Sequence, residues 1–156
     1  MPRPNIVKLA VGKGEGSTLL NAFDKALLEA GIGNLNLIRV SSILPPGCQL
    51  KESFDVPPGS LTPTAYGYLM ADEPGTRIAA AIGIGFSDGD HGVIMEFSGR
   101  CTQEEAEARV RSMVEEAFAM RQKELKAVYV KAIDHVVESK GAVVAAAVLW
   151  YEGGVP

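Results

Sequence analysis

The pattern of apolar and polar positions is clearest after Thr102, where it predicts an amphipathic helix. Thr102-Gln103-Glu104-Glu105 has the form of a capping box, with the threonine as the cap and Glu105 at the third helical position. An apolar stripe at helical spacing follows, and it consists of Ala106, Val110, Met113, Ala117 and Met120. We therefore expect this stripe to lie on the core, with its two methionines as core filler.

A first helix is predicted from Ser17 or Thr18 to about Ala30. Either hydroxyl residue can cap the start of the helix, and the glycines at 31 and 33 can end it. Its expected apolar face recurs at helical spacing and consists of Leu20, Phe23, Leu27 and Ala30.

The remaining apolar runs are short and predict about seven β-strands, at residues 6–11, 35–40, 65–71, 77–86, 93–97, 127–137 and 142–151. We expect the glycine-rich residues 12–16 to form a flexible connection and residues 49–63 to form an irregular loop. Many connections between the strands are short, so much of the sheet structure should be antiparallel. Two helices combined with these strands indicate an α+β fold.

Composition narrows the class of protein. The 156 residues are most simply one domain, residues 1–156, and 47% hydrophobic residues suffice for a core. The net charge of −4 comes without a basic patch, so we expect no nucleic-acid partner. No window approaches 18 uncharged apolar residues, so we expect no membrane span.

The few cysteines and histidines indicate a reducing compartment and no metal. Cys48 and Cys101 are far apart in the sequence, and His91 and His135 are the only histidines, so neither a disulfide nor a metal site is expected. Residues 1–5 lack the apolar segment of a signal peptide, and we expect a cytoplasmic protein.

Two adjacent serines, Ser41 and Ser42, stand between the apolar residues 36–40 and the turn-forming Pro45-Pro46-Gly47. The hydroxyl of the second serine can attack the carbonyl carbon before it, and the resulting ester can eliminate and hydrolyse to leave a ketone. Such a cleavage would create a carbonyl electrophile, which no unmodified side chain supplies. Because a serine pair alone commonly ends a strand or begins a turn, its surroundings decide the interpretation.

Four stretches and the closing segment surround this pair in a recognisable order. They are Leu20-Asn21-Ala22-Phe23-Asp24 with the residues up to Asn34, Asn36-Leu37-Ile38-Arg39-Val40-Ser41-Ser42-Ile43-Leu44-Pro45-Pro46, Pro63-Thr64-Ala65-Tyr66-Gly67-Tyr68, Ile94-Met95-Glu96, and Ala145 to Tyr151. Together they resemble the pyruvoyl-dependent arginine decarboxylase family. The resemblance covers most of the chain and is weakest in the first dozen residues and in residues 49–61.

This resemblance implies a four-layer αββα sandwich that assembles as trimers or as dimers of trimers. It also implies self-cleavage between Ser41 and Ser42 into a β chain, residues 1–41, and an α chain, residues 42–156. The α chain would begin with a pyruvoyl group made from Ser42, so neither PLP nor a metal is expected. Asn36 matches a family position linked to this processing, where its amide can donate a hydrogen bond to the oxyanion.

The resemblance further implies decarboxylation of L-arginine to agmatine and carbon dioxide through a Schiff base to the pyruvoyl group. Glu96 would be the proton donor, because an acid in the apolar strand 92–97 can keep its proton through burial. Asp24 would bind the substrate guanidinium through two parallel hydrogen bonds. Taken without the resemblance, Asp24 in mid-helix reads as a solvated charge and Glu96 as a residue at an exposed sheet edge.

Two other interpretations stay open at this point. The same pyruvoyl chemistry can act on another amino acid, since a change of pocket depth would favour a different side chain. A chain that never cleaves would instead be a non-catalytic oligomeric binding protein. A serine hydrolase is disfavoured, because Ser42 has no Gly-x-Ser-x-Gly context.

Overall fold

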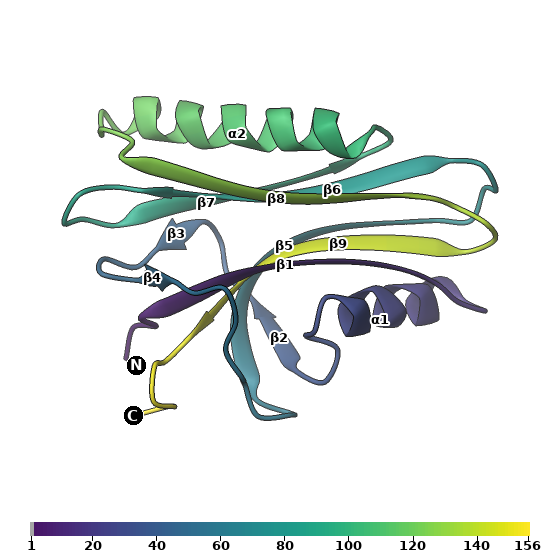
Figure 1. Ribbon diagram of the computed structural model, residues 1–156, viewed down its shortest axis with the longest axis horizontal. Helices are drawn as coiled ribbons and strands as arrows, with labels where there is room; N and C mark the ends of the chain where they lie inside the picture. Colours follow the sequence, from purple (N-terminus) through teal and green to yellow (C-terminus); the bar gives the residue numbers. More distant parts are fainter. Residues whose placement is uncertain (1) are drawn as a thin grey trace.

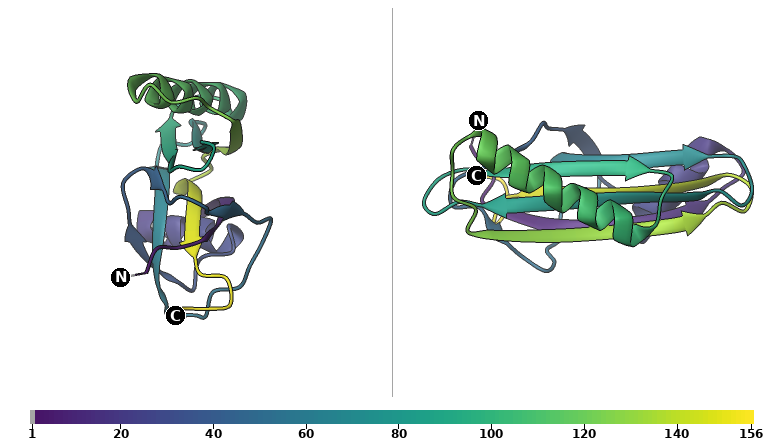
Figure 2. Two further views of the ribbon diagram at one scale, coloured as in Figure 1. Left: turned by 90° about the vertical axis from the view of Figure 1, so that its left-hand side faces the viewer. Right: turned by 90° about the horizontal axis from the view of Figure 1, so that it is seen from above.

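The computed structural model describes residues 2–156, whose helices and strands stack in four layers (Figure 1). The layers are α1, a first sheet, a second sheet and α2, and Figure 2 shows α2 running obliquely across the strands of the second sheet. In chain order the elements are β1 (Ile6–Glu15), α1 (Leu19–Glu29), β2 (Asn36–Arg39), β3 (Ile43–Leu44), β4 (Gln49–Leu50), β5 (Leu61–Ala71), β6 (Arg77–Phe86), β7 (Gly92–Gly99), α2 (Gln103–Met120), β8 (Ala127–Val136) and β9 (Gly141–Trp150).

The strands form two sheets of different strand order. Sheet A has the order β2-β5-β9-β1-β4, and sheet B has the order β3-β7-β6-β8. Neighbouring strands are antiparallel except in the β1–β4 and β2–β5 pairs, which are parallel. The predicted α+β class, with largely antiparallel sheets, is therefore confirmed.

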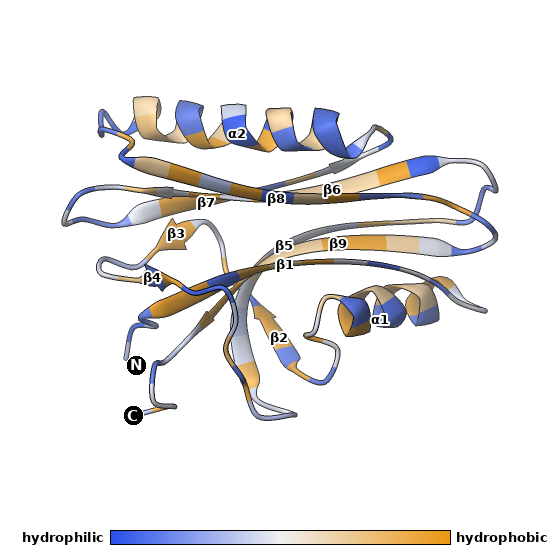
Figure 3. Ribbon diagram, viewed as in Figure 1, coloured by the Kyte–Doolittle hydropathy of each residue, from blue (hydrophilic) through white to orange (hydrophobic). Residues whose placement is uncertain are grey.

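The core lies between the two sheets and under each helix. All ten residues of β9 are buried, since the strand runs through the middle of sheet A between α1 and sheet B. Figure 3 shows strands that are mostly apolar, whereas α2 alternates between polar and apolar residues. The alanine-rich sequence of β9 suits this position, because small side chains allow layers on both faces to approach closely.

The glycine-rich residues 12–16 are not the flexible connection that the sequence predicts, because β1 continues through them to Glu15 in register with β9. Their glycines are required by α1, which packs directly against this part of the strand. A Cβ at Gly12 would overlap the Ala26 carbonyl oxygen, and one at Gly14 would lie 2.5 Å from Lys25 Cγ. The glycines thus reflect close packing of a helix on a strand, and not a mobile link.

The predicted helices are present, but their buried faces are offset from the prediction. In α1 the fully buried residues are Ala22 and Ala26, while Leu20 is 74% exposed. In α2 the stripe continues through Val114 and Phe118, and Met120 is 73% exposed and not core filler. Small residues meet the sheet in α1 because the helix lies so close to β1 that a larger side chain would not fit.

The segment from 49 to 63 was expected to be an irregular loop, and that prediction is wrong at both ends. Residues 49–50 form β4, which pairs in parallel with the start of β1. Residues 61–64 form the first part of β5 and pair in parallel with β2. A parallel pair of this kind joins residues that are distant in sequence, so short-range patterns do not reveal it.

The turn between β8 and β9 is held by the carboxylate of Glu15 from the end of β1. Its oxygens accept hydrogen bonds from the backbone N–H groups of Glu138, Ser139 and Lys140 at 2.9–3.1 Å. His135 Nε2 lies 2.6 Å from the Glu15 carboxylate. Burial by itself would raise the pKa of Glu15, but the hydrogen bonds from His135 and from the turn outweigh it and lower this pKa.

Replacing Glu15 with glutamine should therefore destabilise the protein at neutral pH by about 1–2 kcal/mol, because a neutral amide accepts hydrogen bonds less strongly than a carboxylate. The lowered folded-state pKa means that the carboxylate contribution is complete above the ordinary value of 4.5 and is lost as pH falls through the folded value. Urea unfolding of both proteins at pH 7 and at acidic pH measures this, and the difference should shrink in acid. The exposed Glu138→Gln in the same turn is the control and should have little effect at either pH.

Candidate active site

The serine pair lies where the chain passes from sheet A to sheet B. Before the pair, the Val40 N–H donates to the Thr64 carbonyl oxygen of β5 at 3.2 Å, which continues the β2–β5 pairing. After it, the Ile94 N–H of β7 donates to the Ser42 carbonyl oxygen at 2.7 Å. Packed sheets lie about 10 Å apart, and the three residues from the Val40 N–H to the Ser42 carbonyl span about 10 Å when extended. The Ser41–Ser42 bond is thus the link between two anchored points, with Ser41 exposed and Ser42 half-buried.

Glu96 follows Ile94 on β7 at a spacing of two, so both side chains point toward sheet A. The glutamate lies over Gly67 of β5, where an added Cβ would come within 3.1 Å of Glu96 Cβ and 3.2 Å of Glu96 Cγ. Its side chain is 27% exposed. Burial raises the pKa of Glu96, and the nearby Arg39 guanidinium lowers it by a smaller amount, so the carboxyl keeps its proton to a higher pH than an ordinary glutamate.

Arg39, the last residue of β2, borders the same place. Its Nη2 donates to the Tyr66 carbonyl oxygen at 2.8 Å and lies 3.8 Å from Glu96 Oε1. The guanidinium carbon is 4.9 Å from the centroid of the Tyr66 ring. Arg39 therefore joins the edge of β5 to the carboxyl that lies between the sheets.

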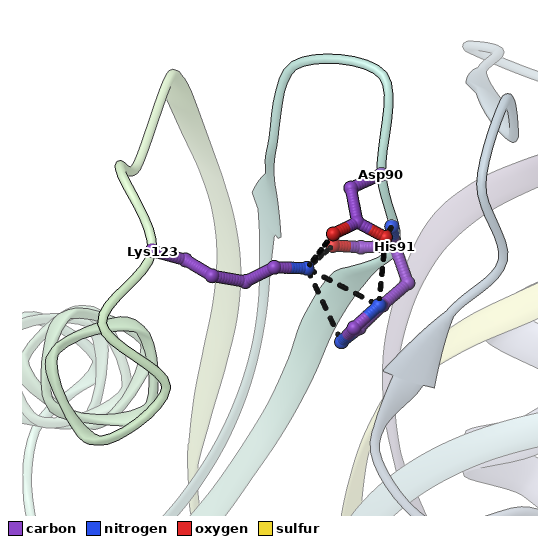
Figure 4. A network of polar contacts seen from close by, with 3 residues as sticks. All are labelled: Asp90, His91 and Lys123. Carbon is purple, nitrogen blue, oxygen red and sulfur yellow. Dashed lines mark hydrogen bonds and ion pairs between the residues drawn. The ribbon is translucent and has the colours of Figure 1, made fainter.

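The start of β7 is fixed by a polar network outside this site (Figure 4). Lys123, from the connection after α2, lies 2.8 Å from the Asp90 carboxylate and donates to the His91 carbonyl oxygen at 3.0 Å. Hydrogen bonds from Lys123 and from the His91 N–H lower the pKa of Asp90 to about 2. The network holds the turn from which β7 runs toward Ile94 and Glu96.

The two other predicted site residues lie away from the serines within the same chain. Asn36 begins β2, and its amide donates to the Gly59 carbonyl oxygen at 3.0 Å. Five residues of extended chain, roughly 15 Å, separate it from Ser41. Asp24 is exposed on α1, which covers the face of sheet A that is turned away from sheet B, and it forms no ion pair or side-chain hydrogen bond with any of residues 2–156.

The aromatic residues near Asp24 pack against one another. The rings of Phe23 and Tyr68 have their centroids 5.0 Å apart, and those of Tyr66 and Tyr68 are 6.0 Å apart. Both tyrosines therefore belong to one aromatic cluster with Phe23. Because the Tyr66 ring also contacts Arg39, the aromatic cluster extends from α1 across β5 to Arg39.

The sequence singles out Ser42 and Glu96 as catalytic residues, but it does not reveal the groups that connect them to sheet A. Three contacts between distant segments put these groups in place: β2 pairs with β5, β5 of sheet A packs against β7 of sheet B at Gly67, and β7 donates a hydrogen bond to Ser42. One signal was present in the sequence. Arg39 stands two positions before Ser41, and the other three residues of its strand, Asn36, Leu37 and Ile38, carry no charge. An arginine at the end of such a strand needs a hydrogen-bond acceptor or an acidic side chain nearby.

The surroundings of Ser42 suit a ketone whose neighbouring amide oxygen takes up electron density. A backbone N–H donor already holds the Ser42 carbonyl oxygen, and a carboxyl with a raised pKa lies two residues farther along the donor's strand. Among residues 2–156 there is no group of three or more His, Cys, Asp or Glu side chains suited to a metal ion. Neither of the helices described there is long and apolar enough to cross a membrane.

The fold and this site define a two-sheet α+β sandwich with a serine pair and a half-buried acid where its sheets meet. The family model for pyruvoyl-dependent arginine decarboxylase matches residues 7–153. A pyruvoyl-dependent arginine decarboxylase of Methanocaldococcus jannaschii is 49% identical over 151 residues, which are 96% of this chain and 92% of that protein. Those of Thermococcus kodakarensis and Pyrococcus abyssi are 45% and 42% identical, and each match covers 95% of this chain and 96% of the relative. The chain belongs to the pyruvoyl-dependent arginine decarboxylase family.

Proposed function

We propose that this chain cleaves itself between Ser41 and Ser42 and then decarboxylates L-arginine to agmatine and carbon dioxide. The observation that carries the proposal is the position of the serine pair, anchored to sheet A on one side and to sheet B on the other, with Glu96 beside it. Family membership and the names of the relatives support arginine as the substrate.

Cleavage begins with attack of the Ser42 hydroxyl on the Ser41 carbonyl carbon, which transfers the acyl group from nitrogen to oxygen. Elimination breaks the new ester and leaves the Ser41 carboxylate, and hydrolysis at position 42 consumes one water and releases ammonia. Hydrogen bonds on both sides of the pair restrict the backbone that carries the reacting groups, which favours an intramolecular reaction. The products are residues 1–41 and residues 42–156, the second of which begins with a pyruvoyl group.

The two pieces should remain together after cleavage. The shorter one carries β1, whose ten residues pair with β9, and α1, which packs on the same strands. The cut therefore removes one covalent link between the sheets and leaves the core as it was.

The pyruvoyl ketone would supply an electrophile for the substrate amine and a sink for the electrons that departing carbon dioxide leaves behind. The Ile94 N–H donates to the carbonyl oxygen of residue 42, and such a donor favours negative charge on that oxygen. Burial raises the pKa of Glu96, which favours the protonated acid that can deliver a proton to the α-carbon of the substrate.

The test is a decarboxylation assay with arginine, lysine, ornithine and aspartate as substrates. Arginine should be turned over best, because Asp24 offers a carboxylate to a guanidinium. Ser42→Ala should abolish both cleavage and turnover. Glu96→Gln should cleave normally and lose roughly 100-fold or more in kcat, since a proton donor contributes at least that much. The exposed Glu73→Gln should match the wild-type protein.

Preference for another amino acid would overturn the substrate assignment and favour the same pyruvoyl chemistry on a different side chain. Neither cleavage nor turnover in the wild-type protein would overturn the proposal as a whole. It would leave the non-catalytic oligomeric binding protein as the better interpretation.

We also propose that the active unit is a homo-oligomer, a trimer or a dimer of trimers, with each site shared between two copies. Beside the site, β2 pairs only with residues 61–64 of β5, and β3 pairs only with the first two residues of β7. The rest of both strand edges has no strand partner among residues 2–156. Exposed apolar side chains occur on the elements around these edges, namely Leu20, Leu28, Ile38, Ile43 and Tyr68.

A shared site also accounts for the positions of Asp24 and Asn36. Neither reaches Ser42 of its own chain, but both lie at the surface, where a second copy can present them to the Ser42 of its neighbour. Glu96 and Ser42, in contrast, belong to the same chain within one site.

Co-expression of inactive chains distinguishes a shared site from a site within one chain. Ser42→Ala and Asp24→Asn chains mixed in equal amounts should regain about a quarter of the wild-type sites, because one interface in four combines the two intact halves. Ser42→Ala mixed with Glu96→Gln is the matched control and should regain none. Equal failure of both mixtures, in oligomers shown by mass to be mixed, would contradict the shared site.

A further inference from the structure

Arg39 is the one charged group that the site contains without a role in the proposed chemistry. It is held from two directions by Tyr66, through the 2.8 Å hydrogen bond to the backbone oxygen and through the ring 4.9 Å from the guanidinium carbon. A guanidinium held by both an aromatic ring and a backbone acceptor has one preferred orientation, although the side chain is 50% exposed. The orientation directs Nη2 to the Glu96 carboxyl.

The contact between Arg39 and Glu96 is electrostatic. At 3.8 Å, Nη2 is beyond hydrogen-bond distance of Oε1, so a charge acts on the carboxyl without a shared proton. Gly67 of β5 and Ile82 of β6 face the carboxyl without charge, and the phenols of Tyr66 and Tyr68 lie on the other face of β5. Within residues 2–156, Arg39 is the only ion-pair partner of Glu96.

We infer that Arg39 is a positioning residue for Glu96, and that its fixed charge sets both the place of the carboxyl and the pH range over which the carboxyl keeps its proton. The inference rests on the proposed function, in which Glu96 donates the proton to the substrate. Arg39 acts through Glu96 and does not itself contact the reacting atoms.

The physical reason is a balance between two opposing effects on one group. Burial between the sheets favours the neutral acid, and a positive charge nearby favours the carboxylate. An acid whose pKa is too high transfers its proton slowly, and an acid whose pKa is too low is already deprotonated at the working pH. Arg39 counteracts burial and so keeps Glu96 a transferable acid.

Two variants of the full-length protein test this role. Arg39→Met removes the charge and keeps an unbranched side chain over Tyr66, whereas Arg39→Lys keeps the charge. In each, ¹³C NMR titration of the Glu96 side-chain carboxyl, assigned with Glu96→Gln, gives its pKa without reference to activity. Arg39→Met should raise this pKa, and Arg39→Lys should leave it close to the wild-type value.

The same direction should appear in the pH dependence of kcat for fully cleaved protein. Activity is lost as pH rises through the pKa of the donor, so this alkaline limb should move to higher pH in Arg39→Met. Arg100→Met, which removes another exposed arginine paired with a glutamate, should not move it. Because Arg39 lies near the cleavage point, intact mass first confirms that each variant is processed.

An unchanged Glu96 pKa in Arg39→Met, with kcat lowered equally at every pH, would overturn the inference and leave Arg39 a structural residue. A large rise in KM for arginine with an unmoved alkaline limb would also overturn it, since Arg39 would then bind the substrate. A wild-type protein that does not decarboxylate arginine would contradict the proposed function instead, and the NMR titration would still decide the effect of Arg39 on Glu96.

Discussion

The passage of the chain between the two sheets is the constraint on which the rest of the site depends. On one side the Val40 N–H is bound to Thr64 in sheet A, and on the other the Ser42 carbonyl oxygen is bound to Ile94 in sheet B. Because the gap between packed sheets is comparable to the reach of the three residues from Val40 to Ser42, the Ser41–Ser42 bond has little freedom. The Ser41–Ser42 sequence is thereby part of the short connection between β2 in sheet A and β3 in sheet B.

The same packing that fixes the serines also provides the acid. Glu96 enters the space between the sheets because Gly67 opposite it has no side chain, and a Cβ there would press on the glutamate at 3.1 Å. Burial then raises the pKa of Glu96, and Arg39, held at the end of β2, opposes that rise. Strand β2 thus contributes both to the anchoring of the serine pair and to the state of the acid.

Much of the fold could be predicted from the sequence, because local signals agree with the final structure. The capping box at Thr102 starts α2, and the apolar runs become strands. Errors arose where tertiary packing overrides a local signal. The glycines of residues 12–16 suggested flexibility, although α1 requires them for close approach, and the apolar stripe of α1 did not reveal that Ala22 and Ala26 face the sheet.

The site was predictable only in part for a related reason. Ser42 and Glu96 stand out in short motifs, and the structure brings their strands together through the β3–β7 pairing. The role of Arg39 depends on the parallel β2–β5 pairing. This pairing joins residues more than twenty positions apart and leaves no periodic pattern in the sequence. Asp24 and Asn36 could be singled out by resemblance, but their distance from Ser42 within one chain becomes visible only in three dimensions.

The most direct test of this account is an intact-mass measurement of the freshly purified protein under denaturing conditions, with a native measurement alongside. Self-cleavage predicts two denatured species, residues 1–41 and residues 42–156 without an N-terminal amine, which stay together in one native assembly. A single uncut chain that remains uncut on prolonged incubation would contradict it, because the anchored Ser41–Ser42 bond would then be an ordinary link between two sheets.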